Sequence, residues 1–171
     1  MALILSGDSP SLSGTYQGGA LTSGTSQAST SGTSIDFTSI PSWVKRVTVM
    51  FNGVSTNGTS NIQVQIGAGS IDTTGYNSIY GVGGGSNVAT SGFVVTYTTA
   101  ATYLRTGNIV INLLASNGWV ESGMLGDYSN TVVQSMSQGY KSLSGSLDRV
   151  RITTVNGTDT FDAGSINILY E

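Results

Sequence analysis

The fold class is decided by the stretch VKRVTVMFNGVSTNGTSNIQVQIG, which runs from Val44 to Gly67. Two sets of apolar residues alternate with polar ones along it: Val47, Val49 and Phe51, then Ile62, Val64 and Ile66. Successive side chains of a strand point to opposite faces, so each set marks a strand with one apolar face. The Asn-Gly-containing segment between the two sets is typical of a turn. The stretch therefore predicts a β-hairpin.

The same alternation recurs downstream and predicts further strands at 34–38, 93–99, 107–116, 148–155 and 165–171. Two irregular, Gly-rich or polar stretches, 68–91 and 126–139, are expected to be loops. No segment keeps a 3.6-residue apolar period, so little helix is expected. We therefore predict an all-β fold: an antiparallel β-sandwich, jelly-roll-like, over residues 34–171 and preceded by an extended N-terminal arm.

The strand expected at 107–116 differs from the others because it is apolar on both faces. Ile109 and Ile111 lie on one side, and Val110 and Leu114 on the other. Such a strand is typical of the centre of a sheet or of an interface. The pair Asn117-Gly118 then predicts a hairpin turn into the next strand.

Residues 1–33 form the predicted arm, a short strand followed by a low-complexity segment rich in Gly and Ser. Ordering such a segment costs backbone entropy that few side chains repay. Two interpretations stay open for Ser11–Ser34. It is a flexible linker, or it is an arm that becomes ordered only along a neighbouring subunit, anchored by Tyr16 and Leu21.

Composition excludes several classes of function. Charged residues make up 9% of the 171 residues and only 6 are basic, which argues against binding to nucleic acid. The chain has no Cys and no His, so thiolate and Ser-His-Asp catalysis are excluded and no cofactor is expected. The first residues lack the basic region of a signal peptide, and no apolar stretch reaches the roughly 20 residues that would span a bilayer.

Carboxylates offer two weak candidates for chemistry. Glu121 and Asp127 are the nearest pair for a glycosidase, but we interpret Glu121 as a solvent-facing strand residue and Asp127 as a turn former. Asp159 and Asp162 could donate oxygens to Ca²⁺, yet they lack the spacing of an EF-hand loop. Turn chemistry explains them better, so no catalytic or metal site is predicted.

Tyrosines in the irregular stretches are the better candidates for binding. Tyr76, Tyr80 and Tyr128 could stack on sugar rings, while the amide-rich neutral surface around them could bond to sugar hydroxyls. A host-surface glycan is therefore a possible ligand of these residues.

Two stretches, Ile35–Gly67 and Leu147–Glu171, resemble the C-terminal globular domain of bacteriophage tail-fibre-like virion proteins. The resemblance covers most of the chain from residue 34 onward. It implies a non-enzymatic, trimeric β-sandwich on the surface of the virion. The first Met and the lack of a signal peptide fit a protein made and assembled in the cytoplasm of the host bacterium. That family usually carries the domain at the end of a longer fibre chain, whereas only the low-complexity segment precedes it in this sequence.

The expected function is that of a virion structural protein. We expect a homotrimer that contacts other virion proteins and acts as a tail-fibre or spike tip that binds a receptor. A capsid decoration protein on the phage head is the alternative. A polysaccharide-degrading enzyme that uses Glu121 and Asp127 is a distant third.

Overall fold

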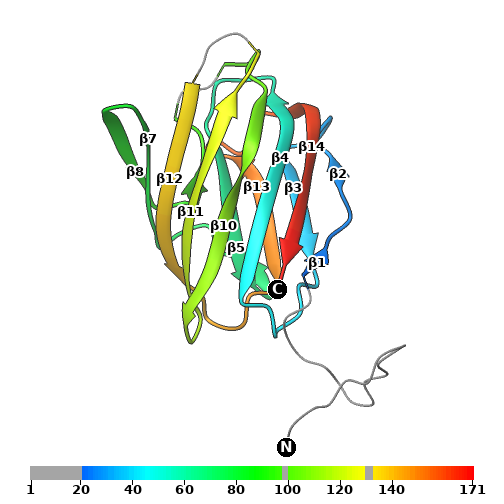
Figure 1. The fold of residues 1–171 in the computed structure, drawn as a ribbon, viewed down its shortest axis with the longest axis vertical. Coiled ribbons are helices and arrows are strands. Elements are labelled where there is room, and N and C mark those ends of the chain that lie inside the picture. The colour runs from blue at the N-terminus through cyan, green and yellow to red at the C-terminus, as the bar shows by residue number, and fades with distance from the viewer. Residues whose placement is uncertain (1–20, 98–99, 130–132) are drawn as a thin grey trace, which may run out of the picture.

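The structure, a computed structural model, describes residues 21–97, 100–129 and 133–171. In these ranges the regular elements are all strands, so no helix capable of crossing a membrane is present there. The strands form two antiparallel sheets that face each other (Figure 1). The predicted all-β, antiparallel sandwich is confirmed. Its jelly-roll form stays a prediction.

Within the described ranges, the larger sheet has nine strands and the smaller has five. In the larger sheet the order is β1 (Thr22–Ser23), β14 (Phe161–Tyr170), β4 (Arg46–Thr56), β10 (Arg105–Ala115), β11 (Gly118–Asp127), β12 (Val133–Ser142), β7 (Tyr76–Val82) and β8 (Gly85–Ala89), and β2 (Gln27–Ala28) also pairs with β14. In the smaller sheet the order is β3 (Ser34–Thr38), β13 (Arg149–Thr154), β5 (Ile62–Ala68) and β6 (Ser70–Ile71), and β9 (Phe93–Val94) also pairs with β5.

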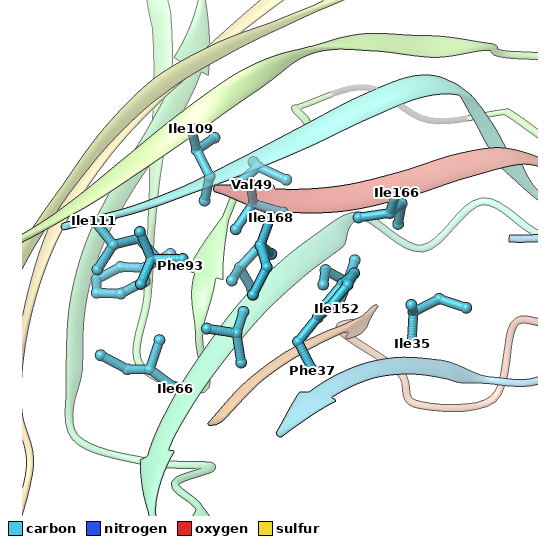
Figure 2. Packing of buried hydrophobic residues seen from close by; sticks show 14 of the residues in the cluster. Ile35, Phe37, Val49, Ile66, Phe93, Ile109, Ile111, Ile152, Ile166 and Ile168 are labelled. Carbon is cyan, nitrogen blue, oxygen red and sulfur yellow. The ribbon is translucent and has the colours of Figure 1, made fainter. Parts of the chain in front are cut away.

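The core lies between the two sheets, as Figure 2 shows. The large sheet contributes alternate residues of β4, β10 and β14, and the small sheet contributes alternate residues of β3, β5 and β13. Among those labelled are Val49, Ile109, Ile111, Ile166 and Ile168 from the large sheet and Ile35, Phe37, Ile66 and Ile152 from the small sheet. Both apolar sets predicted within 44–67 are buried in this core, which confirms the inward faces of these strands.

The predicted hairpin at 44–67 is wrong in its pairing. Both strands exist, but β4 pairs with β10 and β14, whereas β5 pairs with β13, β6 and β9. The connection at 57–61 therefore crosses from one sheet to the other. An alternating pattern identifies the buried face of a strand but not its partner, because either pairing buries the same side chains.

Two other hairpins shape the large sheet. β10 and β11 join through Ser116-Asn117, one residue before the predicted Asn117-Gly118 pair, and Ser116 takes a φ of 51°. β7 and β8 join through Gly83-Gly84, both at positive φ, as a two-residue hairpin turn requires. The loops predicted at 68–91 and 126–139 are therefore wrong, since they contain β6, β7, β8 and much of β12.

The described part of the predicted arm belongs to the sandwich itself. β1 pairs with the end of β14, with Thr22 opposite Tyr170, and β2 pairs with its middle, with Gln27 opposite Ile166. The expectation that this segment orders only on a neighbouring subunit is wrong from residue 21 onward, because β14 supplies the pairing within one chain. The preceding 20 residues, Tyr16 among them, lie outside the described residues.

Candidate interaction surface

The strand β12 carries polar residues on its inner side and exposes a methionine and a tyrosine on its outer side, whereas β11 buries both apolar and charged residues. Ser135, Ser137 and Lys141 of β12 are buried against the sandwich interior, and Glu121 of β11 lies among them. Met136, on the opposite face of β12, is 54% exposed. An ordinary sandwich strand shows the reverse arrangement, with polar residues outward.

Outward-facing side chains of four neighbouring strands form one apolar surface. We call it the outer apolar surface and define it by Ile79, Val88, Met124, Met136 and Tyr140, all of them exposed. Figure 1 places their strands β8, β7, β12 and β11 side by side at one edge of the large sheet. Contiguous exposed apolar patches on a soluble protein are typical of interaction sites.

The strand register brings four of these residues together as two pairs, and the amide side chain of Gln138, opposite Ile79, lies between the pairs. Met124 lies directly opposite Met136, and Ile79 lies directly opposite Val88. Directly opposed residues in an antiparallel pair have Cβ atoms about 5 Å apart, so each pair forms one continuous apolar contact. Methionine suits such a surface because its flexible thioether adapts to differently shaped partners.

Tyr140 covers a glycine on the neighbouring strand. A Cβ added at Gly118 would lie 2.8 Å from the Tyr140 hydroxyl and 3.1 Å from its Cε2, so the absence of a side chain makes room for the ring. On its other side, Tyr140 borders a depression of about 460 Å³. Its lining includes Asn77, Ile79, Val88, Thr90 and Gln138.

The outer apolar surface carries no charge. β7, β8 and β11 contain no basic residue, the one basic residue of β12 is the buried Lys141, and the carboxylates of β11 face inward. Lys141 is held on the inner side, where its Nζ lies 2.8 Å from Asp72 Oδ2 and 5.2 Å from the centroid of the Tyr76 ring. A charge-free apolar surface is what a protein interface core prefers.

Glu121 is buried beneath this surface. Its exposed fraction is 2%, its Oε1 accepts a hydrogen bond of 2.7 Å from the Ser137 hydroxyl, and its Oε2 has no hydrogen-bond partner within the described ranges. Burial raises the pKa of Glu121 to about 7, although the bond from Ser137 acts in the opposite direction. The expected solvent-facing position of Glu121 is therefore wrong.

Asp127 lies at the end of β11 and organises the loop that follows. Its Oδ1 accepts hydrogen bonds from the backbone N–H groups of Leu104 and Ser129, each at 3.0 Å, and from the Ser129 hydroxyl at 2.7 Å. Burial alone would raise the pKa of Asp127, but these bonds and the nearby charge of Arg105 lower it below its ordinary value. The prediction that Asp127 is a turn former agrees with these local contacts.

Glu121 and Asp127 do not have the geometry of a glycosidase pair. They lie on the same inner side of β11, six residues apart, which separates them by about 20 Å along a strand. Paired glycosidase carboxyl groups lie roughly 5 to 9.5 Å apart across an open site.

The candidate calcium residues instead stabilise turns. The side-chain oxygen of Asn156 accepts from the backbone N–H groups of Thr158 and Asp159, which is an Asx-turn. Asp159 accepts from the backbone N–H of Ser60, and Asp162 accepts from the Ser55 hydroxyl. Among the described residues, no three acidic, His or Cys side chains gather in a way that could hold a metal ion.

The tyrosines and the leucine that were predicted to contact partners lie in different parts of the structure. Tyr76 is 1% exposed, and its hydroxyl accepts from the backbone N–H of Ile66, so its predicted role as a contact is wrong. Tyr80 is half-buried beside the β7–β8 turn, and Tyr128 is exposed after β11. Leu21 is exposed at the opposite edge of the sheet, beside β1. None of these residues forms a common site with another.

The outer apolar surface was missed by the sequence reading, although two signals for it exist. The Gly-Gly pair at 83–84 is a strong hairpin signal. Met124 and Met136 also fall at matching distances from the turn between β11 and β12. Neither signal was recognised in the sequence, because the inward-facing residues of β12 are polar and give no apolar alternation.

Comparison with known proteins returns no matching family model, no matching curated protein and no matching solved structure.

Proposed function

We propose that this protein is a non-enzymatic structural component of a bacteriophage particle, assembled as a homotrimer and acting as a fibre or spike tip that binds a receptor. The outer apolar surface carries the assembly role, because it is exposed, contiguous and free of charge. The resemblance of Ile35–Gly67 and Leu147–Glu171 to tail-fibre-like virion domains supplies the kind of particle.

The distribution of charge supports a role in assembly. Ion pairs use Asp36 with Arg151 on the small sheet, Asp148 with Arg149 at its margin, and Arg46 with Glu171 at a corner of the large sheet. The outer apolar surface lies away from all three, so a partner could cover it without burying an unpaired charge.

Receptor binding is assigned to Tyr128 and to the β7–β8 turn beside this surface. Tyr128 is 65% exposed, and Tyr80 borders a depression of about 360 Å³ that Ile79 and Met136 also line. Both tyrosines offer an aromatic ring next to uncharged backbone and amide groups, which suits a neutral glycan of the host surface better than an ionic ligand.

The test is the position and copy number of the protein in the particle. Immunogold labelling and quantitative mass spectrometry of purified virions should place a few copies on the tail. Labelling over the capsid lattice at high copy number would replace this proposal with the capsid decoration alternative. Absence of the protein from purified virions would overturn both functions.

A separate assay tests the non-enzymatic part. Purified protein should leave host polysaccharide uncleaved. If cleavage occurs and is lost in the Glu121→Gln and Asp127→Asn variants, the protein is an enzyme and the proposal fails.

A further inference from the structure

The edge of the large sheet next to the outer apolar surface is open and unprotected. Among the described residues, β8 pairs only with β7, so the outer row of its backbone N–H and C=O groups is left for another strand. Natural sheet edges are usually blocked by Lys, Pro or a bulge. The β8 sequence GSNVA has no such residue, and its register with β7 runs without a bulge.

An apolar side chain of β8 stands beside this open edge. Val88 is 78% exposed, and with Ile79 it forms one wall of the depression that Tyr140 borders. A strand added to β8 would place alternate side chains on the same outward face as Val88. The occupant should therefore be a short, uncharged and apolar segment.

The chain itself supplies such a segment. Ala2–Leu5 has the sequence ALIL, and 15 residues, 6–20, separate it from the first described residue, Leu21. Fully extended, those 15 residues span about 50 Å. The nine-stranded sheet has β1 at one end of its order and β8 at the other, about 34 Å apart at the usual strand spacing.

We propose that Ala2–Leu5 of one copy adds to the β8 edge of a neighbouring copy and covers Val88 there. The chain enters the sandwich at the β1–β14 edge, opposite β8. To reach β8 of the same copy, residues 6–20 would have to cross the strands of the sheet, and the backbone groups of that crossing connection would lack ladder partners. A neighbour whose β8 edge lies beside the β1–β14 edge meets the segment along the strand direction.

This arrangement is head-to-tail, because two different edges meet. Head-to-tail contacts close into rings, and the homotrimer of the proposed function is one such ring. The inference rests on that self-association but not on the phage particle, so it can be tested with the isolated protein.

The absence of Cys from the whole chain allows a direct test by disulfide trapping. Under mild oxidation the Leu3→Cys, Val88→Cys double variant should form covalent dimers and trimers on a non-reducing gel. The matched control is Leu3→Cys with Val155→Cys, because Val155 is an exposed valine beside the other sheet. The control should remain almost entirely a single chain.

Four results would overturn the proposal. A disulfide confined to single chains of the Val88 variant places the segment on its own copy. Equal cross-linking in the Val155 control shows random collision. A protein that sediments as a trimer but gives no Val88 cross-link refutes the arm contact and leaves the trimer standing, whereas a monomer refutes both.

A second variant set tests the same contact without cysteines. Leu3→Ser with Leu5→Ser, and separately Val88→Ser, should shift the sedimenting species from trimer to monomer at micromolar concentration. Val155→Ser should leave the trimer unchanged. Retention of the trimer in both of the first two variants would contradict the proposal.

Discussion

The outer faces of the two sheets have opposite character. The small sheet presents the Asp36–Arg151 ion pair and the side chains of Gln63 and Gln65, which are hydrogen-bonded beneath the loop at Ser91. The part of the large sheet formed by β11, β12, β7 and β8 presents methionines, aliphatic side chains and Tyr140, with no charge among them. On the small sheet, the polar and charged groups of the outer face have partners within the same chain. On the large sheet, no described residue covers the apolar side chains of the outer face.

The inner sides of the two sheets differ as well. The small sheet buries Val64, Val150 and Ile152, whereas β12 of the large sheet buries Ser135, Ser137 and Lys141. A strand therefore does not reveal by composition alone which of its sides faces the interior. This difference predicts which substitutions should change the free energy of unfolding and which should change only self-association.

The largest expected effect comes from the carboxyl group beneath the outer apolar surface. Below about pH 4.5 Glu121 is protonated in both the folded and the unfolded state. As the pH rises to about 7, the unfolded state loses this proton first, because burial raises the folded pKa to about 7. The free energy of unfolding should therefore fall by about 3 kcal/mol across this window and stay low above it.

Urea unfolding of the wild type and of Glu121→Gln between pH 4.5 and 8 measures this effect. The variant should lose the downward slope and exceed the wild type in stability above pH 7. Ser122→Ala, on the outer side of the same strand, is the control and should keep the slope. Identical slopes in wild type and Glu121→Gln would show that Glu121 ionises normally.

A smaller effect is expected on the small sheet, from the buried amide of Gln65. Its Nε2 donates a 2.7 Å hydrogen bond to the backbone carbonyl of Ser91. Gln65→Ala should lower the free energy of unfolding by about 1 to 2 kcal/mol, because it leaves that carbonyl without its donor. Gln138→Ala, which removes an exposed amide from the large sheet, should change it by less than about 0.5 kcal/mol. Equal losses would mean that the two outer faces do not differ.

The ion pair on the small sheet should matter less still. Arg151 Nε lies 2.7 Å from Asp36 Oδ1, but both side chains are more than a third exposed. Asp36→Asn should lower the free energy of unfolding by about 0.5 kcal/mol, since water and salt screen an exposed pair. Unfolding at low and at high salt checks this. A loss that persists undiminished in 1 M salt would contradict a screened surface pair.

The smallest effect on folding, and a large effect on association, is expected for the opposed methionines. Met124→Ser with Met136→Ser should change the free energy of unfolding of the isolated chain by about 0.5 kcal/mol or less, since both side chains are half-exposed. Sedimentation should nevertheless show weaker self-association than in the wild type. Unchanged association would remove these residues from the contact surface.

Strands with an apolar inner side could be predicted from the sequence, and they were. The patterns at Ile35 and Phe37, at Val150 and Ile152, and along 165–171 located β3, β13 and most of β14. Their partners could not be predicted, because pairing depends on which sheet each strand joins and not on its own alternation. The misassigned hairpin of β4 and β5 follows from that limit.

Strands with a polar inner side escaped prediction. In β12 the inward residues are Ser135, Ser137 and Lys141, so the sequence resembles a loop although its backbone is fully paired. Tyr76 was mistaken for a binding residue for the same reason, since its surroundings looked irregular while its hydroxyl is bonded within the core. The candidate surface was therefore invisible until the side of each strand was known.

The pairing of the C-terminal strands has a consequence for how the chain is made. β13 lies between β3 and β5, and the Arg151–Asp36 bond joins residues 115 positions apart. β14 likewise joins β4 to β1. On the ribosome, neither sheet can close until these last strands have emerged, so the earlier strands must wait with open edges. We expect folding to be slow, and chains truncated or stalled before β13 to aggregate.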